Sequence, residues 1–197
     1  QSWTIAWGDG TSDTVAGDAT SATHVYSGGG GRTIQVQAIN EDGMFTADPL
    51  TVAVEENDAP AIEPVADQTL FEGETLSLQL GATDPEGDAV TWSLESAPAG
   101  ANIDPTSGLL TWTAADGPAT AAFKVRATDD AAAQEFSEVS FAATVTDVAP
   151  TLSVSGAAGV REGESYTLSL GASDPGEDTI QSWTIAWGDG TSDTVAG

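Results

Sequence analysis

Acidic side chains dominate the ionisable residues of this sequence and are its candidate cation ligands. The 197 residues include 31 Asp and Glu but only 4 Lys and Arg, so the formal net charge is −27. The acids do not form one block. They recur in predicted loops, beside Gly and Pro residues at matching positions. Such recurrence predicts fixed sites for cations, and hard oxygen ligands in this number suit calcium, which takes about six to eight. A solubilising, edge-protecting acidic surface is the alternative.

Catalysis is a weaker interpretation of the same acids. Glu72 with Glu74, or Asp84 with Asp88, could in principle form the carboxylate pair of a glycosidase. Corresponding acids occur in corresponding loops of repeated units, however, and this repetition indicates a structural feature. His24 is the only histidine and no nucleophile motif accompanies it, so we expect it to pack or to bond a turn. We therefore predict that the chain is not an enzyme.

The overall charge and composition exclude several classes of partner. A strongly anionic chain is repelled by nucleic acid and by anionic membranes, so we expect neither as a partner. No apolar stretch is long enough to span a membrane, and we expect no membrane insertion in this segment. The absence of cysteine excludes disulfides and thiolate metal sites. With 40% hydrophobic residues, the chain is too apolar to be simply disordered.

Internal repetition sets the architecture that must position these acids. The first seventeen residues, QSWTIAWGDGTSDTVAG, return unchanged as Gln181–Gly197, an offset of 180 residues. A second period lies inside the first, since Leu70–Pro85 (LFEGETLSLQLGATDP) resembles Val160–Pro175 (VREGESYTLSLGASDP) at an offset of 90. A fixed period of this kind is typical of repeat architectures. The pattern predicts half a unit at 1–57, a whole unit at 58–147 and another half at 148–197.

The local patterns predict an all-β fold. Trp3, Ile5 and Trp7 alternate with small or polar residues, which favours a strand with one buried face over exposed, sugar-stacking aromatics. Gly8-Asp9-Gly10 predicts a turn with positive φ angles. Short strands at regular spacing, separated by Gly, Pro and Asp, indicate an all-β sandwich, with Trp92 and Trp112 in the core. The expected strands are 33–39, 50–54, 76–80, 90–94, 109–113, 121–127, 139–145, 152–155, 165–170 and 180–187.

Two family resemblances follow from particular motifs. Trp187-Gly188-Asp189-Gly190, with Thr23-His24-Val25-Tyr26 and Val36–Gly43 of the repeat, resembles the PKD domain, here split between the two ends of the chain. Asn40-Glu41-Asp42 departs from the Asp-rich run usual in that family. The whole unit resembles the Ig-like, cadherin-like domains of large bacterial surface proteins, through the motifs Glu72-Gly73-Glu74, Ala82–Asp88, Pro98–Asp104, Gly108–Trp112 and Val125–Asp130. These resemblances imply serial sandwiches in an extracellular or cell-surface repeat protein.

In an Ig-like sandwich, the acidic loops meet the linkers at opposite poles, and cadherin-like modules hold calcium there. The linkers are 55–60 and 146–150; the first contains Glu56-Asn57-Asp58-Ala59, a partial version of the D-x-N-D-N motif, and we expect it to bind better than the second. The first joint is predicted to contain Glu55, Glu56, Asn57, Asp58, Asp84, Glu86, Asp88, Asp129 and Asp130. The second joint is predicted to contain Glu72, Glu74, Asp147, Asp174, Glu177 and Asp178.

The function expected from these features is mechanical. We predict a structural segment of a bacterial fibre, stalk or adhesin, with structural calcium at its joints. The alternatives are an adhesive module that recognises a surface glycan or protein, and a non-catalytic appendage of a secreted hydrolase. The two half units are expected to complete one another head to tail, between copies or between successive periods, because each alone leaves a bare sheet edge and an apolar face. We expect the halves of one copy not to meet, because a sandwich about 33 Å long lies between them.

Overall fold

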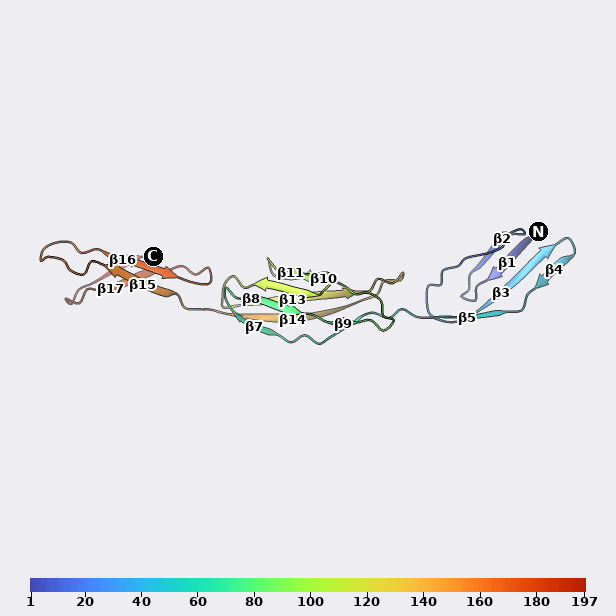
Figure 1. Cartoon of the computed structure of the whole chain (residues 1–197), viewed down its shortest axis with the longest axis horizontal. Helices are drawn as coiled ribbons and strands as arrows, with labels where there is room; N and C mark the ends of the chain where they lie inside the picture. Colours follow the sequence, from blue (N-terminus) through green and yellow to red (C-terminus); the bar gives the residue numbers. More distant parts are fainter. The chain divides into compact units, whose positions relative to one another are not determined.

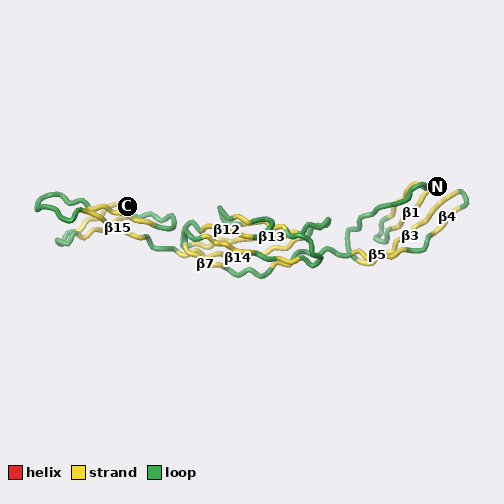
Figure 2. Tube along the Cα trace, in the orientation of Figure 1, coloured by secondary structure: helices red, strands yellow, loops and turns green.

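The computed structural model describes all residues from 1 to 197 and contains strands, turns and loops but no helix. Figures 1 and 2 show this composition along the whole chain. The predicted all-β fold is therefore confirmed. Because there is no helix, no helical segment is available to cross a membrane.

Two units emerge from the contacts within the chain, and we describe each by itself. The first unit contains 1–59 together with the loops 84–89 and 129–135, and the second contains 60–83, 90–128 and 136–197. The boundaries predicted at 57/58 and 147/148 from the repeat remain a prediction.

A sheet with the order β2-β1-β3-β4, in which β5 also pairs with β3, forms the first unit. Its strands are β1 (Ser2–Ala6), β2 (Ser12–Ala16), β3 (Gly30–Asn40), β4 (Gly43–Thr46) and β5 (Leu50–Val54). Gly8 and Gly10 have φ angles of 82° and 94°, as the predicted turn between β1 and β2 requires. Ile5 and Trp7 are buried, as their alternation predicted, whereas Trp3 is only half-buried.

An Ig-like sandwich occupies the middle of the sequence. One sheet has the order β10-β13-β14-β7 and the facing sheet the order β11-β12-β8. These strands are β7 (Gln68–Phe71), β8 (Thr75–Gln79), β10 (Thr91–Ser96), β11 (Asn102–Ile103), β12 (Leu109–Thr113), β13 (Ala119–Thr128) and β14 (Phe136–Thr146). The short strands β6 (Ala61–Ile62) and β9 (Ala82–Thr83) pair with each other.

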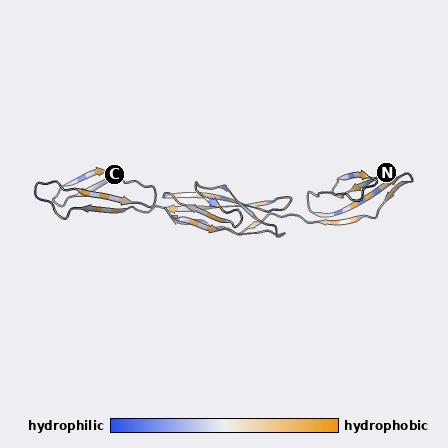
Figure 3. Cartoon of the chain, turned by 45° about the horizontal axis from the view of Figure 1, so that its top comes forward, coloured by the Kyte–Doolittle hydropathy of each residue, from blue (hydrophilic) through white to orange (hydrophobic).

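The sandwich core consists of inward-facing residues of both sheets. Phe123 stacks on Phe141 with ring centroids 4.9 Å apart, and Trp112 meets Phe123 edge-on at 5.5 Å. Trp92 and Trp112 are buried, which confirms the prediction that they are core residues. Figure 3 shows hydrophobic residues interspersed with polar ones along the strands, the alternation that a sheet with one buried face requires.

The C-terminal strands form two separate hairpins. They are β15 (Thr151–Gly156) with β16 (Leu168–Ser173), and β17 (Ser182–Ala186) with β18 (Ser192–Ala196). The register of β15 with β16 repeats that of β6 with β9, because Thr151 faces Ser173 just as Ala61 faces Thr83, 90 residues earlier. The register of β17 with β18 repeats that of β1 with β2, since Ser182 faces Ala196 as Ser2 faces Ala16.

Candidate metal centre

Glu72 is the most buried acid of the second joint, with 2% of its surface exposed. It follows β7 at a tight turn where Gly73 has a φ of 75°, and the Glu72 amide donates to the Thr146 carbonyl over 3.1 Å. One carboxylate oxygen accepts from the Gly117 amide at 2.9 Å and the other from the Val148 amide at 3.0 Å. Each oxygen has a second lone pair, so Glu72 can still bind a cation.

Asp174 and Asp178 converge on Glu72. One ligand oxygen from each of the three carboxylates lies within 4.8 Å of the other two. The approach is close because residue 176 is glycine, and a Cβ atom there would lie 2.6 Å from Glu72 Oε2. Asp174 Oδ1 accepts from the Gly176 amide at 2.9 Å, whereas Asp174 Oδ2 is buried and has no hydrogen-bond partner. A buried carboxylate oxygen without a partner is costly, and a cation would remove this cost.

Neighbouring acids and desolvation both affect the pKa of Asp178. A hydrogen bond to Asp147, together with desolvation and repulsion from Asp116, Asp147 and Asp174, raises the pKa of Asp178 above its ordinary value. The ionised form is therefore disfavoured in the absence of a counter-ion. Three converging carboxylates with further acids beside them are a hard-oxygen donor set, which fits calcium better than a soft transition metal.

The second joint differs in detail from its predicted membership. The structure brings together Glu72, Asp147, Asp174 and Asp178, but Glu74 instead accepts from the Phe71 amide at 2.7 Å and is exposed. Glu177 is also exposed and outside the three-carboxylate group. Asp116 was missed, because the Asp116-Gly117-Pro118 motif was interpreted only as a turn. The signal that could have identified Asp116 is its place in an Asp-Gly-Pro turn, since Gly117 of that turn lies against the 146–150 linker.

The first joint contains a looser set of acids. Asp84 Oδ1 accepts from the amides of Glu86, Gly87 and Asp88 at 3.0 to 3.1 Å, which closes the loop around it. Desolvation, with repulsion from Asp84, Asp130 and Asp129, raises the pKa of Asp88. These loops therefore concentrate negative charge around Asp88.

Asp129 connects this cluster to the linker. It is 1% exposed and accepts from Asn57 Nδ2 at 3.0 Å and from the Glu135 amide at 3.1 Å. The Asp58 amide donates to Glu86 at 3.1 Å, and the Ala89 amide donates to Asp130 at 2.8 Å. Seven of the nine predicted residues thus take part in one network.

Glu55 and Glu56 are exposed and take no part in that network, and no three of the first-joint carboxylates come within 4.8 Å of one another. The sequence favoured the first joint, but the structure gathers carboxylates more tightly at the second.

Asp84 and Asp174 share one unusual feature. They lie 90 residues apart in matching Asp-Pro turns, and in both the Oδ2 atom is buried without a hydrogen-bond partner. The same unsatisfied oxygen thus occurs twice at equivalent positions.

His24 has a local structural environment. Its ring stacks on Trp7 at 4.8 Å, its Nε2 atom lies 2.7 Å from Asp9 Oδ2, and Tyr26 donates to the Trp7 carbonyl at 3.0 Å. The Thr11 hydroxyl also lies 3.4 Å from this Nε2 atom. These contacts attach the Thr23–Tyr26 segment to the β1–β2 turn.

Comparison with known structures gives matches below 20% identity. A protocadherin gammaB7 structure titled as an EC3-6 cis-dimer aligns with a TM-score of 0.43, 19% identity and coverage of 64% of this chain and 36% of that one. Human CDH23 EC21-23 aligns with a TM-score of 0.42, 18% identity and coverage of 79% and 58%. This chain spans about a third of the first protocadherin chains it matches.

A family model gives the more specific result. Residues 59–146 match the model described as "Putative Ig domain" (He_PIG), whereas the search of curated proteins found no match. The matched segment coincides with the two-sheet sandwich whose core surrounds Phe123. Residues 59–146 of this all-β chain are therefore an Ig-like domain.

Proposed function

We propose that this chain is a structural segment of an extracellular repeat protein, a fibre, stalk or adhesin of bacterial origin. Ig-like and PKD-like units alternate in it and extend head to tail, with structural calcium at the joints. It performs no catalysis. The resemblance of the two half units to the PKD domain supports the alternation, and the repeats at 90 and 180 residues support the serial arrangement.

The observation that carries this proposal is the recurrence of an unsatisfied buried carboxylate at Asp84 and Asp174. At the second joint, Glu72 and Asp178 point ligand oxygens at the same place. An ion bound there would connect the Glu72 turn, which belongs to the Ig-like domain, to the 174–178 loop, which belongs to the following strands. Such a link stiffens the connection without a hydrophobic interface.

Thermal unfolding tests the proposal. An ion that binds only the folded state stabilises it by about 2.7 kcal/mol at a hundredfold excess over its Kd, which corresponds to a rise in Tm of about 10 °C. We expect this rise in calcium relative to EDTA, with ionic strength matched to control for screening. Asp178→Asn should remove most of the rise, whereas Glu164→Gln, an exposed charge outside the cluster, should leave it intact. Equal Tm values in calcium and EDTA would leave only a solubilising acidic surface.

A further inference from the structure

The hairpins β1–β2 and β17–β18 have the same sequence and the same strand pairing but different neighbours. The indole of Trp7 donates to Asp13 at 2.7 Å, and that of Trp187 donates to Asp193 at 2.8 Å. The differences between them therefore come from their neighbours alone.

Only β1 has a partner on its second edge. It pairs with β3, so that Thr4 faces Gln37, whereas β17 pairs with β18 and with no other strand. Trp7 is 8% exposed beneath His24, but Trp187 is 37% exposed, and Val195 is exposed where Val15 is half-buried. No strand lies beside β17 in the position that residues 35–39 of β3 occupy beside β1.

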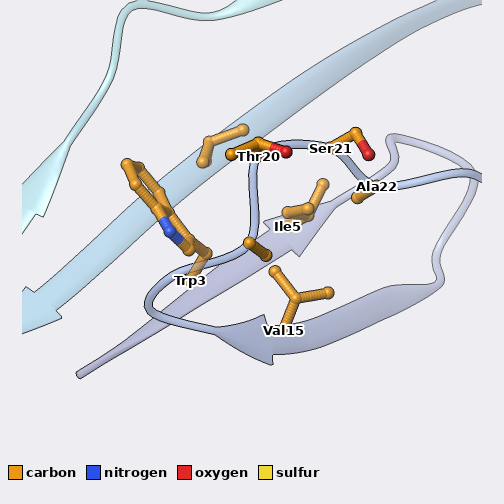
Figure 4. A pocket seen from close by; sticks show the side chains of 8 residues that line it. Trp3, Ile5, Val15, Thr20, Ser21 and Ala22 are labelled. Atoms are coloured by element: carbon orange, nitrogen blue, oxygen red, sulfur yellow. The ribbon is translucent and has the colours of Figure 1, made fainter.

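The face of the first sheet is also incomplete. Trp3, Ile5, Val15 and Val36 line a hollow of about 210 Å³, bordered on one side by 19–22. Figure 4 shows Trp3, Ile5 and Val15 around the open space. In the Ig-like domain, by contrast, Trp92 and Phe123 share one core with Leu76 of β8 and Leu110 of β12 in the facing sheet.

The covering residues have counterparts in the C-terminal strands. Leu70 and Leu76 are 8% and 6% exposed in the Ig-like domain, but their counterparts 90 residues later, Val160 and Tyr166, are 51% and 38% exposed. Leu152 and Val154 of β15 are also exposed, at 57% and 65%. The first sheet thus has an exposed apolar face, and residues 152–166 contain exposed apolar side chains of the kind that cover such a face in the Ig-like domain.

We propose that residues 148–197 of one copy complete the sheet formed by residues 18–57 of a second copy, with β17–β18 taking the place of β1–β2 beside β3. This inference rests on the proposed head-to-tail function and names its contact surface. Because the two hairpins are identical, their exchange leaves the contacts of β3, His24 and Tyr26 unchanged. Burial of the face around Leu152 and Val154 then drives association. The contact is heterologous, and successive contacts of this kind build linear species.

The exchange also moves Glu162 of the added copy. Glu162 is the counterpart of Glu72, 90 residues later, and its place in a completed unit is beside the 57–58 linker, as Glu72 lies beside Val148. This explains why the first joint shows no tight group of three carboxylates within one copy.

A pair of introduced cysteines tests the exchange in the 197-residue chain, which has no cysteine of its own. Facing residues on antiparallel strands lie about 4.5–5.5 Å apart at Cα, within reach of a disulfide. Thr4→Cys with Gln37→Cys is the matched control and should give a bridged monomer. Thr184→Cys with Gln37→Cys should give a ladder of bridged dimers and higher species on a non-reducing gel.

Matched tryptophan variants give opposite expectations. Trp187→Ala weakens the incoming hairpin and should reduce the Thr184–Gln37 ladder, whereas Trp7→Ala weakens the resident hairpin and should increase it. Since loss of a packed Trp costs well over a tenfold factor, the two yields should differ about tenfold or more.

Three results would overturn the exchange: a Thr184–Gln37 pair that stays reduced while the control bridges, a pair that bridges only within one chain, or equal effects of the two Trp variants. Linear growth in light scattering without the Thr184–Gln37 bridge would refute the exchange and leave the proposed head-to-tail function standing. A chain that stays monomeric at all concentrations would refute the exchange and would also remove intermolecular assembly from the proposed function.

Discussion

At the scale of single residues, Asp9 shows how one carboxylate organises a turn. Its Oδ1 atom accepts from the Thr11 hydroxyl at 2.6 Å and the Thr11 amide at 2.9 Å, and its Oδ2 atom faces His24. The bonds from Thr11 and His24 hold the pKa of Asp9 well below its ordinary value. Asp189, the equivalent residue in the hairpin β17–β18, accepts the same two bonds from Thr191 but has no histidine beside it.

This difference predicts unequal effects of one substitution in dilute, monomeric protein. Asp9→Asn should lower the Tm near pH 7 more than Asp189→Asn does, because only Asp9 fastens the segment that contains His24. When a carboxyl group has a lower pKa in the folded state than in the unfolded state, its ionisation stabilises the fold at a pH above the unfolded-state pKa. This stabilisation is lost as the pH falls through the folded-state pKa. The deficit of Asp9→Asn relative to wild type should therefore shrink below about pH 4. A deficit equal to that of Asp189→Asn would contradict a role for His24.

At the scale of elements, the loops that follow β9 and β16 concentrate like charges. The pKa values of Asp88 and Asp178 are raised, so the folded state takes up protons more readily than the unfolded state at these positions. The sign is opposite to that of Asp9: stability increases as the pH falls from neutrality towards the ordinary Asp value.

A pH series in EDTA measures this repulsion. We expect the Tm to rise between about pH 7 and pH 4, and Asp178→Asn to flatten this slope by removing one titrating group. Calcium should flatten it as well, because the ion favours the charged carboxylates. A slope that is the same for wild type and Asp178→Asn would show that general surface charge, and not this loop, produces the effect.

The sequence predicted most strands because alternation and Gly/Pro punctuation are local signals. Strands β5 and β12 have the predicted bounds, and the burial of Trp92 and Trp112 follows from their pattern. Strands β4, β6, β7, β9 and β11 were missed, since they are two to four residues long and are defined by their partners, and β18 was missed together with its repeat β2. Strand β2 was missed because Ser12–Ala16 is mostly polar and exposed, and only its pairing with β1 makes it a strand.

The acidic loops were predictable as positions but not as a geometry. The repeat identified Asp84 and Asp174 as equivalents, and both prove to have the same unsatisfied oxygen. The sequence could not indicate that Glu74 bonds the Phe71 amide while Glu72 turns inward, because the two glutamates differ only in where the backbone of the turn directs them. Asp116 was missed for a similar reason, since its approach depends on tertiary packing.

At the scale of the whole molecule, sequence repeats, sheets with unpaired edges and acidic joints occur together. In the proposed exchange, identical hairpins in different surroundings form an interface that needs no new sequence. Charge of −27 opposes compact association, so close approach of acidic loops requires a counter-ion. Calcium therefore has a double role in the proposed function, because it satisfies the orphaned oxygens of each joint and reduces repulsion between successive units.

Calorimetric titration of the chain with calcium measures whether Glu72, Asp174 and Asp178 bind the ion. We expect saturable binding in wild type and in Glu164→Gln, and loss of at least one binding event in Asp178→Asn, with magnesium as the competing hard cation. Binding heats that are absent, or that are the same in Asp178→Asn and Glu164→Gln, would contradict a calcium site formed by Glu72, Asp174 and Asp178.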